Sequence, residues 1–400
     1  MKKMKQVFSV AMAFALMAVS VTGCGGSTGS TGGDGGDSGS SEDTFYIGGI
    51  GPTTGAAAIY GSCVMNAAQI AVDEINENGG VNGYKLAYRF EDDVNDAEKS
   101  VNAYNSLKDW GMQILMGTVT TTPCIAVVTE TAADGMFQIT PSASSTDVID
   151  GNDNVYQVCF TDPNQGTASA DYIAGDAITD VSKVAVIYDS SSVYSTGIHD
   201  TFVSEAENVG LEVVSDTAFT ADTNTDFNTQ LQKAQEAGAE LVFLPIYYQE
   251  ASIILQQAKA MSFDPIFFGV DGMDGILTLE GFDTSLAEGV MLLTPFSADA
   301  SDETTQNFVS KYQEAYNEIP NQFGADAYDA IYIIKQALEA ADATPDMSAE
   351  DLGAALCEQM SSLVFDGGIT GDSMQWDENG AVNKAPKAVI IENGAYTSMD

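Results

Sequence analysis

The chain has 400 residues, with 58 acidic and 14 basic side chains, one histidine and a formal net charge of −44. A surface that binds polyanions needs clustered lysine and arginine, so this balance excludes nucleic acid and anionic lipid headgroups as expected partners. Because His199 is the only imidazole, we expect no catalytic residues, no metal and no cofactor. The hydrophobic content of 44% still allows a large core, and at about 100–200 residues per domain the length predicts two or three domains.

The N-terminal segment has the pattern of an export signal. Lysines near the start precede an apolar run over residues 7–19, which is short for a membrane-spanning helix. The Val-Thr-Gly-Cys sequence that ends at Cys24 resembles the lipobox of bacterial lipoproteins, so we expect residues 1–23 to be removed and Cys24 to carry lipid. An ordinary cleaved signal with a chance cysteine is the alternative. Residues 24–43 are rich in Gly and Ser and predict a flexible tether, so we expect an extracytoplasmic protein anchored to the cell membrane.

The chain contains four further cysteines, at positions 63, 124, 159 and 357. Export permits disulfides, but these wide spacings do not form a scaffold pattern. A bond between Cys63 and Cys124 and free buried thiols both remain open.

From residue 45 onward, short apolar runs alternate with amphipathic segments, which is typical of βαβ units and parallel sheets. We expect strands at 45–50, 86–90, 114–116 and from 139, with helices over 62–78 and 96–110 and another after the third strand. The pattern restarts at Lys183, with strands at 184–188, near 213, at 241–244 and at 266–268, and helices over 194–209, 226–237 and 251–261. The predicted fold class is therefore α/β, with two successive doubly wound parallel sheets.

Hydroxyl and carboxyl groups follow the ends of several predicted strands, where open α/β sheets bind ligands. After the third strand, Thr122 suits a helix N-cap and Pro123 suits the first turn, and such a helix start binds a carboxylate without arginine. A second hydroxyl run covers residues 142–145, and Asp271 lies in a glycine-rich turn where it could pair with an ammonium group. Helix caps and an Asx-turn are the ordinary structural alternatives.

Tyrosines occupy corresponding places after three predicted strands, at Tyr60, Tyr194 and Tyr247. Packing with a wet hydroxyl is the alternative for each of them. His199 has no partner at metal-ligand spacing, so we expect it on the surface.

An ordered set of segments from Phe45 to the C-terminus resembles one known family, the extracellular solute-binding proteins of branched-chain amino acid ABC transporters, which have the type I periplasmic-binding fold. The segments are Ile47-Gly48 through Tyr60-Gly61, residues 71–83, residues 139–144, residues 160–166, Tyr328-Asp329-Ala330 and residues 376–380. The resemblance implies two lobes that close around a ligand.

The resemblance also implies how the two charged groups of an amino acid are held. The hydroxyls of Thr121 and Ser144 would hold the ligand carboxylate, and the backbone carbonyl of Ser142 would accept from the ligand ammonium. Asp271 would bind the ammonium as the acidic residue of the glycine-rich turn.

The aromatic residues implied by the resemblance lie in both halves of the chain. Tyr194 and Tyr247 match tyrosines of the second lobe, and Tyr60 and Phe323 match aromatics that wall the side-chain pocket. Some positions depart from the family pattern: Thr121 stands where Ser is usual, Ser144 replaces Thr, Gln157 stands where Arg is common, and Asp271 is shorter than the Glu of the leucine binders. These departures leave the preferred ligand side chain open.

In this fold each lobe is discontinuous in sequence. The implied division places residues 44–162 and 295–365 in an N-terminal lobe and residues 163–294 and 366–400 in a C-terminal lobe. The implied hinge has three crossing strands, near residues 160–162, 293–295 and 365–371.

We therefore expect a monomeric receptor, not an enzyme, that binds an amino acid with a branched-chain or other aliphatic side chain and delivers it to ABC permease subunits. Alternatives are a receptor for another small amide, urea or aromatic acid, a sensory module of the same fold, and a surface enzyme. The single histidine and the lack of a metal or nucleophile motif count against the enzyme.

Overall fold

The structure is a computed structural model that describes residues 43–399, all of which belong to one unit of the chain. The expected signal peptide, Cys24 and nearly all of the expected tether lie outside the described residues. No helix in the described part of the chain is both long enough and apolar enough to cross a membrane.

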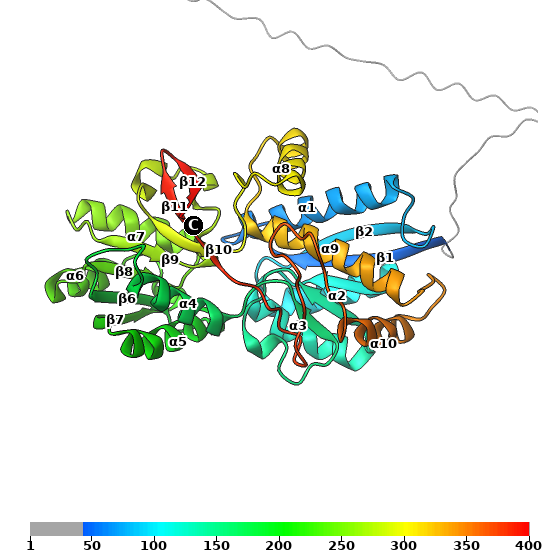
Figure 1. Cartoon of the computed structure of the whole chain (residues 1–400). Coiled ribbons are helices and arrows are strands. Elements are labelled where there is room, and N and C mark those ends of the chain that lie inside the picture. The colour runs from blue at the N-terminus through cyan, green and yellow to red at the C-terminus, as the bar shows by residue number, and fades with distance from the viewer. Residues whose placement is uncertain (1–42, 400) are drawn as a thin grey trace, which may run out of the picture. The chain divides into compact units, whose positions relative to one another are not determined.

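The first lobe is built on a parallel sheet with strand order β2-β1-β3-β4-β5. Its strands are β1 (Thr44–Gly51), β2 (Lys85–Asp92), β3 (Ile114–Gly117), β4 (Phe137–Thr140) and β5 (Val155–Gln157). Its helices are α1 (Ala58–Glu77), α2 (Ala97–Trp110), α3 (Thr121–Asp134), α8 (Glu303–Tyr316), α9 (Gln322–Ala340) and α10 (Ala349–Met360). The helices lie on both faces of the sheet (Figure 1).

Side-chain alternation explains how this sheet buries both faces. Ile114 and Met116 pack on the side of α1 and α9, whereas Leu115 packs with residues of α2 and α3. Successive residues of a strand point to opposite faces, so a continuous apolar run serves two helix layers. The helix expected over 62–78 is confirmed as α1, although it begins four residues earlier than the apolar pattern indicated.

The second lobe has a sheet of order β12-β11-β10-β9-β8-β6-β7, in which the pairs from β7 to β10 are parallel and those of β11 and β12 are antiparallel. Its strands are β6 (Lys183–Asp189), β7 (Glu212–Phe219), β8 (Leu241–Leu244), β9 (Ile266–Gly269), β10 (Met291–Thr294), β11 (Lys387–Glu392) and β12 (Ala395–Ser398). Its α-helices are α4 (Asp162–Ala174), α5 (Val193–Val209), α6 (Asn228–Ala237) and α7 (Tyr248–Ala260).

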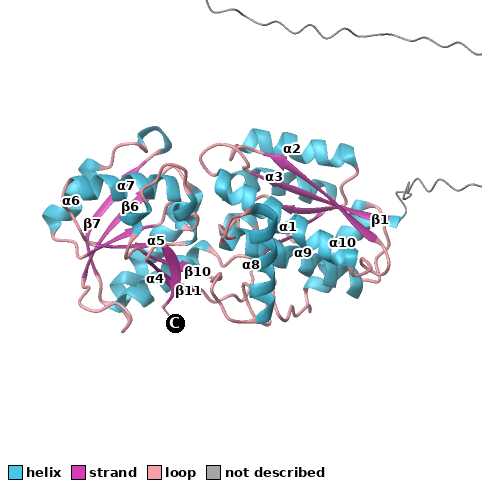
Figure 2. Cartoon of the chain, turned by 90° about the horizontal axis from the view of Figure 1, so that it is seen from above, coloured by secondary structure: helices cyan, strands magenta, loops and turns pink. Residues whose placement is uncertain are grey.

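The same alternation holds in the second lobe. Val184 and Val186 of β6 pack with residues of α4 and α5, whereas Ala185 and Ile187 pack with residues of α6 and α7. Figure 2 shows helices on both sides of the strands in each lobe. The predicted α/β class with two doubly wound sheets is therefore confirmed.

The chain passes between the lobes three times. The strand expected near 293–295 overlaps the end of β10, whereas the backbone of residues 160–161 and 385–386 at the other two passages is irregular. The first passage follows β5 and ends where α4 begins at Asp162, and the second follows β10 and leads to α8. The third lies between Lys384, whose side chain bonds Asp326 of the first lobe, and Lys387, which pairs with Thr294 in the second sheet.

The third passage thus differs from the expected position at 365–371. Residues in that stretch and beyond it bond to the first lobe: Thr370 donates to Asp329 of α9, and the Trp376 indole donates to the Gln157 carbonyl. Residues 366–384, which the sequence-based division gave to the C-terminal lobe, therefore contact the N-terminal lobe. The position at 365–371 was implied by the resemblance alone, and the structure places the passage after Lys384 instead.

The structure also bears on the expectations for His199 and for the cysteines. His199 is buried rather than on the surface, because its ring stacks on Tyr188 at 3.8 Å and its nitrogens bond Asp200 and Asp216. Cys63 and Cys124 are free thiols, as are Cys159 and Cys357.

Candidate ligand site between the two lobes

The loop after β3 brings the first hydroxyl group of the site to the start of α3. The helix begins at Thr121, so Thr122 is not the N-cap and Pro123 is the third helical residue, where its missing N–H costs no helical hydrogen bond. The N-cap is Thr120, whose hydroxyl donates a hydrogen bond to the Asn95 side-chain oxygen at 2.7 Å. Thr121 is buried in the first turn, beside N–H groups that have no partner within the helix.

The loop after the neighbouring strand β4 holds the second hydroxyl group. The Ser142 hydroxyl donates to the Val119 carbonyl at 2.6 Å and so fixes this loop to the β3 loop. Gln157 donates to the carbonyls of Ala143 and Ser145 at 2.7 and 2.9 Å, which holds the backbone on either side of Ser144. The Ser144 hydroxyl is buried and has no hydrogen-bond partner among the described residues.

In the second lobe, the turn after β9 carries Asp271, which is only 3% exposed. The Tyr194 hydroxyl donates to the Asp271 carboxylate at 2.5 Å and accepts from the Gly272 N–H at 3.0 Å. A Cβ at position 272 would stand 2.6 Å from the Tyr194 hydroxyl, so this close approach requires glycine. Burial raises the pKa of Asp271 to about 7, although the hydrogen bonds from Tyr194 and the backbone oppose the shift.

The expected aromatic residues form one group of touching rings. Tyr60 of α1 lies 4.3 Å from the Phe323 ring of α9 and 5.3 Å from the Tyr247 ring, measured between centroids. Tyr247 in turn lies 5.0 Å from Tyr194. Tyr248, which the sequence did not single out, completes the group 5.0 Å from Tyr60. All five rings come from the elements that meet between the lobes.

Hydrogen bonds between the lobes hold these groups together in a closed arrangement. The Tyr60 hydroxyl donates to the Gly272 carbonyl. Gln322, the first residue of α9, donates its backbone N–H to Asp274 at 2.8 Å and its side-chain amide to the Asp271 carbonyl at 3.2 Å. Asp271 and the aromatic group therefore lie where the two lobes touch.

Two residues at the start of α4 belong to this site although the sequence marked them only as part of a resemblance segment. The Asp162 backbone N–H donates to the Ser144 carbonyl at 2.9 Å, and Gln165 accepts from the Asp271 N–H at 3.3 Å. Asp162 is 1% exposed, and neither of its carboxylate oxygens has a hydrogen-bond partner among the described residues. The signal in the sequence is an Asp-Pro pair at a helix start, which also describes an ordinary helix start.

The structure thus brings together Tyr60, Tyr194, Tyr247, Asp271 and Phe323 through direct contacts. Ser142 and Ser144 lie on a loop bonded to the Thr121 loop, and Ser144 reaches the second lobe through Asp162.

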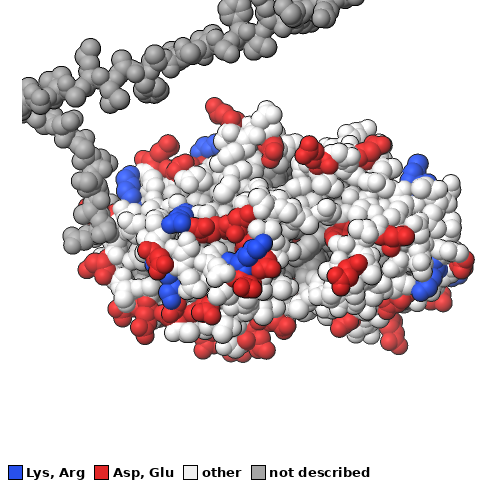
Figure 3. Space-filling view, turned by 180° about the vertical axis from the view of Figure 1, so that it is seen from behind, with Lys and Arg blue, Asp and Glu red and all other residues white. Residues whose placement is uncertain are grey.

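The charged side chains that act on Asp162 and Asp271 are themselves acidic. No cluster of metal-binding side chains occurs among the described residues. Acidic side chains spread over the face seen in Figure 3, with scattered Lys and Arg between them. The arrangement offers hydroxyls and a helix start on one lobe and a carboxylate on the other, which is complementary to a zwitterion.

The chain belongs to the periplasmic binding protein family, whose model matches residues 44–394. It is 30% identical over 305 residues to Leu/Ile/Val-binding protein homolog 3 of Brucella melitensis, covering 76% of this chain and 81% of that protein. It is 28% identical to the leucine-, isoleucine-, valine-, threonine- and alanine-binding protein of Pseudomonas aeruginosa, over 78% of this chain and 83% of that protein.

Solved structures agree with the fold. The branched-chain amino acid transporter substrate-binding protein of Streptococcus pneumoniae in complex with isoleucine superposes with a TM-score of 0.79 at 25% identity, covering 89% of this chain and 98% of that one. A leucine-binding protein of Thermotoga maritima gives a TM-score of 0.78 at 25% identity, covering 88% and 97%. The two-lobed fold expected from the resemblance is therefore confirmed.

Proposed function

We propose that this protein is the lipid-anchored substrate-binding protein of an ABC importer. It binds an amino acid with a branched-chain or other aliphatic side chain between its lobes and delivers it, as a monomer, to the permease. The observation that supports this most directly is the placement of complementary groups: the second lobe carries the buried Asp271 carboxylate, and the first lobe carries the buried Ser144 hydroxyl, which has no hydrogen-bond partner among the described residues, on a loop bonded to the loop before Thr121.

The proposed binding mode follows from the charges of the two lobes. The ligand carboxylate accepts from the Thr121 and Ser144 hydroxyls and from free N–H groups at the start of α3. The ligand ammonium donates to Asp271 and to the Ser142 carbonyl. Because groups from both lobes hold one ligand, the ligand stabilises the closed form by its higher affinity for that form.

The aromatic group accounts for the proposed aliphatic preference. The rings of Tyr60, Tyr247 and Phe323 offer apolar faces beside Asp271, and the hydroxyl of Tyr60 is used on Gly272. Among the described residues, the ring contacts of this group include no cation that could pair with an acidic ligand side chain. An aliphatic side chain buries apolar area there at roughly 25 cal/mol per Å².

Titration calorimetry tests the ligand class. We expect heat and saturable binding of leucine, isoleucine or valine, and weaker binding of the matching amino-acid amides and of the deaminated 2-keto acids. Those two analogues each lack one charged group, so they report separately on the hydroxyl loops and on Asp271. Absence of heat with every α-amino acid would contradict the proposal.

The proposed lipid anchor has its own test. Growth of the expressing bacterium with a radioactive fatty acid should label the protein, and Cys24→Ser should abolish the label. Retention of the label in that variant would place the lipid elsewhere.

A further inference from the structure

Three buried polar groups without partners lie together at the point where the first passage enters the second lobe. They are the carboxylate of Asp162, the hydroxyl of Ser144 and the amide nitrogen of Gln165, and none of them has a hydrogen-bond partner among the described residues. All three residues are at most 1% exposed. Buried polar atoms are nearly always bonded, so three together indicate a group that completes them.

Both lobes contribute to the burial of Asp162. From the first lobe, the Ser144 carbonyl accepts from the Asp162 N–H at 2.9 Å, and the Ser144 hydroxyl lies near enough to act on the carboxylate. From the second lobe, α5 passes so close that a Cβ at Gly197 would stand 3.3 Å from one carboxylate oxygen. Separating the lobes would admit water to this carboxylate.

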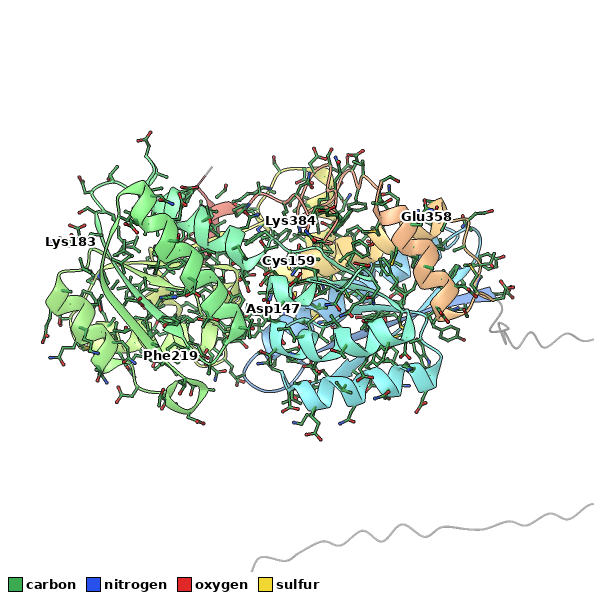
Figure 4. All side chains as sticks on the ribbon, turned by 90° about the horizontal axis from the view of Figure 1, so that it is seen from below. Asp147, Cys159, Lys183, Phe219, Glu358 and Lys384 are labelled. Carbon is green, nitrogen blue, oxygen red and sulfur yellow. The ribbon has the colours of Figure 1, made fainter. Side chains whose placement is uncertain are left out.

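The charged and titratable groups around Asp162 offer it no free cation. The groups that act on it or respond to it are Asp271 of the β9 turn, Asp147 of the loop after β4, Cys159 of the first passage and Tyr247 before α7. Lys384 also acts on Cys159, but its ammonium is bonded to Asp326 and Thr370. Figure 4 labels Asp147, Cys159 and Lys384 in this region.

We infer that Asp162 is a second acidic group facing the ligand and that its unpaired charge keeps the empty protein from closing at neutral pH. This inference rests on the proposed function, because a cationic group of the ligand is what lets the lobes close over an ionised Asp162. Closing without a ligand buries the carboxylate beside the Ser144 hydroxyl but without a cationic partner among the described residues, which is strongly unfavourable. A ligand ammonium removes that penalty, and so does a proton.

The direction of the pH effect follows from burial. In the closed form, burial raises the pKa of Asp162 well above its ordinary value, and the nearby Asp271 adds to the shift. In an open form with a wet carboxylate, the group keeps a lower pKa. The closed empty form therefore binds a proton more tightly than the open form, so falling pH favours closure.

Small-angle X-ray scattering of the empty protein tests the inference. At pH 7.5 we expect the wild-type radius of gyration to exceed that of the ligand-saturated protein, and to fall toward it as the pH is lowered to 5. Asp162→Asn, which removes the charge and keeps the shape, should have the smaller radius at pH 7.5 without any ligand. Asp147→Asn, which neutralises a neighbouring exposed acid, is the matched control and should behave as wild type.

An empty Asp162→Asn protein that keeps the wild-type radius at pH 7.5 would overturn the inference. If that variant does not fold, the wild-type pH series decides, because a radius unchanged down to pH 5 overturns it equally. The two decisive comparisons, Asp162→Asn against wild type at pH 7.5 and wild type at pH 7.5 against pH 5, use only the empty protein, so they remain decisive even if calorimetry finds no amino acid that binds.

Discussion

Two groups of fully buried carboxylates lie near the passages between the lobes, and they differ in what surrounds them. In the first group, Asp326 binds the Lys384 ammonium at 2.7 Å, and Asp329 accepts from the N–H groups of Ile369 and Thr370 at 3.1 and 2.9 Å and from the Thr370 hydroxyl at 2.7 Å. We call Lys384, Asp326, Asp329 and Thr370 the hinge cluster.

The second group consists of Asp162 and Asp271, whose carboxylates together have fewer hydrogen-bond partners within the protein than those of the hinge cluster. The Asp271 carboxylate accepts from one tyrosine hydroxyl and from backbone donors, and the Asp162 carboxylate has no hydrogen-bond partner among the described residues. A carboxylate that maintains the fold is expected to fill its acceptor sites within the protein, whereas one that binds a ligand is expected to keep some acceptor capacity for it. We therefore expect the first group to act in folding and the second group to act in ligand binding.

The largest expected effect is on stability and comes from Lys384→Met in the hinge cluster. It leaves the Asp326 carboxylate buried without its cation, and breaking such a pair costs about 3–5 kcal/mol of unfolding free energy. Urea unfolding followed by circular dichroism measures this loss.

The double variant Lys384→Met, Asp326→Leu is the control. With both charges removed, much of the lost stability should return, because two apolar groups replace a buried ion pair at little cost. A double variant as unstable as Lys384→Met would mean that the pair matters through shape rather than charge.

Asp271→Asn also removes one buried charge, but at the proposed ligand site. We expect it to lower ligand affinity and not stability. The ligand ammonium loses a charge-assisted hydrogen bond worth about 1.5–3 kcal/mol, so calorimetry should show affinity weaker by at least about 10-fold. The empty protein should be as stable as wild type or more stable at pH 8, because burial raises the pKa of Asp271 to about 7 and its charged form is then disfavoured by folding. Unchanged affinity would remove Asp271 from the site.

Sequence patterns predicted the fold because they follow local rules. The strand expected at 184–188 and the helix expected over 62–78 depend only on neighbouring residues, and both are confirmed, as β6 and α1. The third passage could not be located in this way. The stretch around Thr370 and Trp376 has turn residues whichever lobe it contacts, and only its long-range bonds to Asp329 and Gln157 decide.

The residues of the candidate site also fall into those that local sequence predicts and those that only long-range contacts reveal. Asp271 and the tyrosines follow predicted strand ends, and the structure places them together. The sequence does not distinguish Asp162, because an acid at a helix start has an ordinary role there, and only the folded structure shows that its carboxylate lacks a hydrogen-bond partner among the described residues. The prediction that His199 lies on the surface was wrong because its burial depends on another element: its ring stacks on Tyr188 of β6.

The smallest expected effect comes from Ser142 and Ser144, two serines of one loop. They test whether polar groups without a partner in the protein are the ones that bind the ligand. The Ser142 hydroxyl already donates to the Val119 carbonyl, whereas the Ser144 hydroxyl has no partner among the described residues. Ser144→Ala should therefore weaken ligand binding by the worth of one hydrogen bond, about 0.5–1.5 kcal/mol, with little change in stability. Ser142→Ala should lower stability by a similar amount and leave affinity nearly unchanged, because the proposed ligand contact at this position is the backbone carbonyl. Calorimetry and urea unfolding of both variants check the pair, and a loss of affinity confined to Ser142→Ala would contradict the rule that unpartnered groups face the ligand.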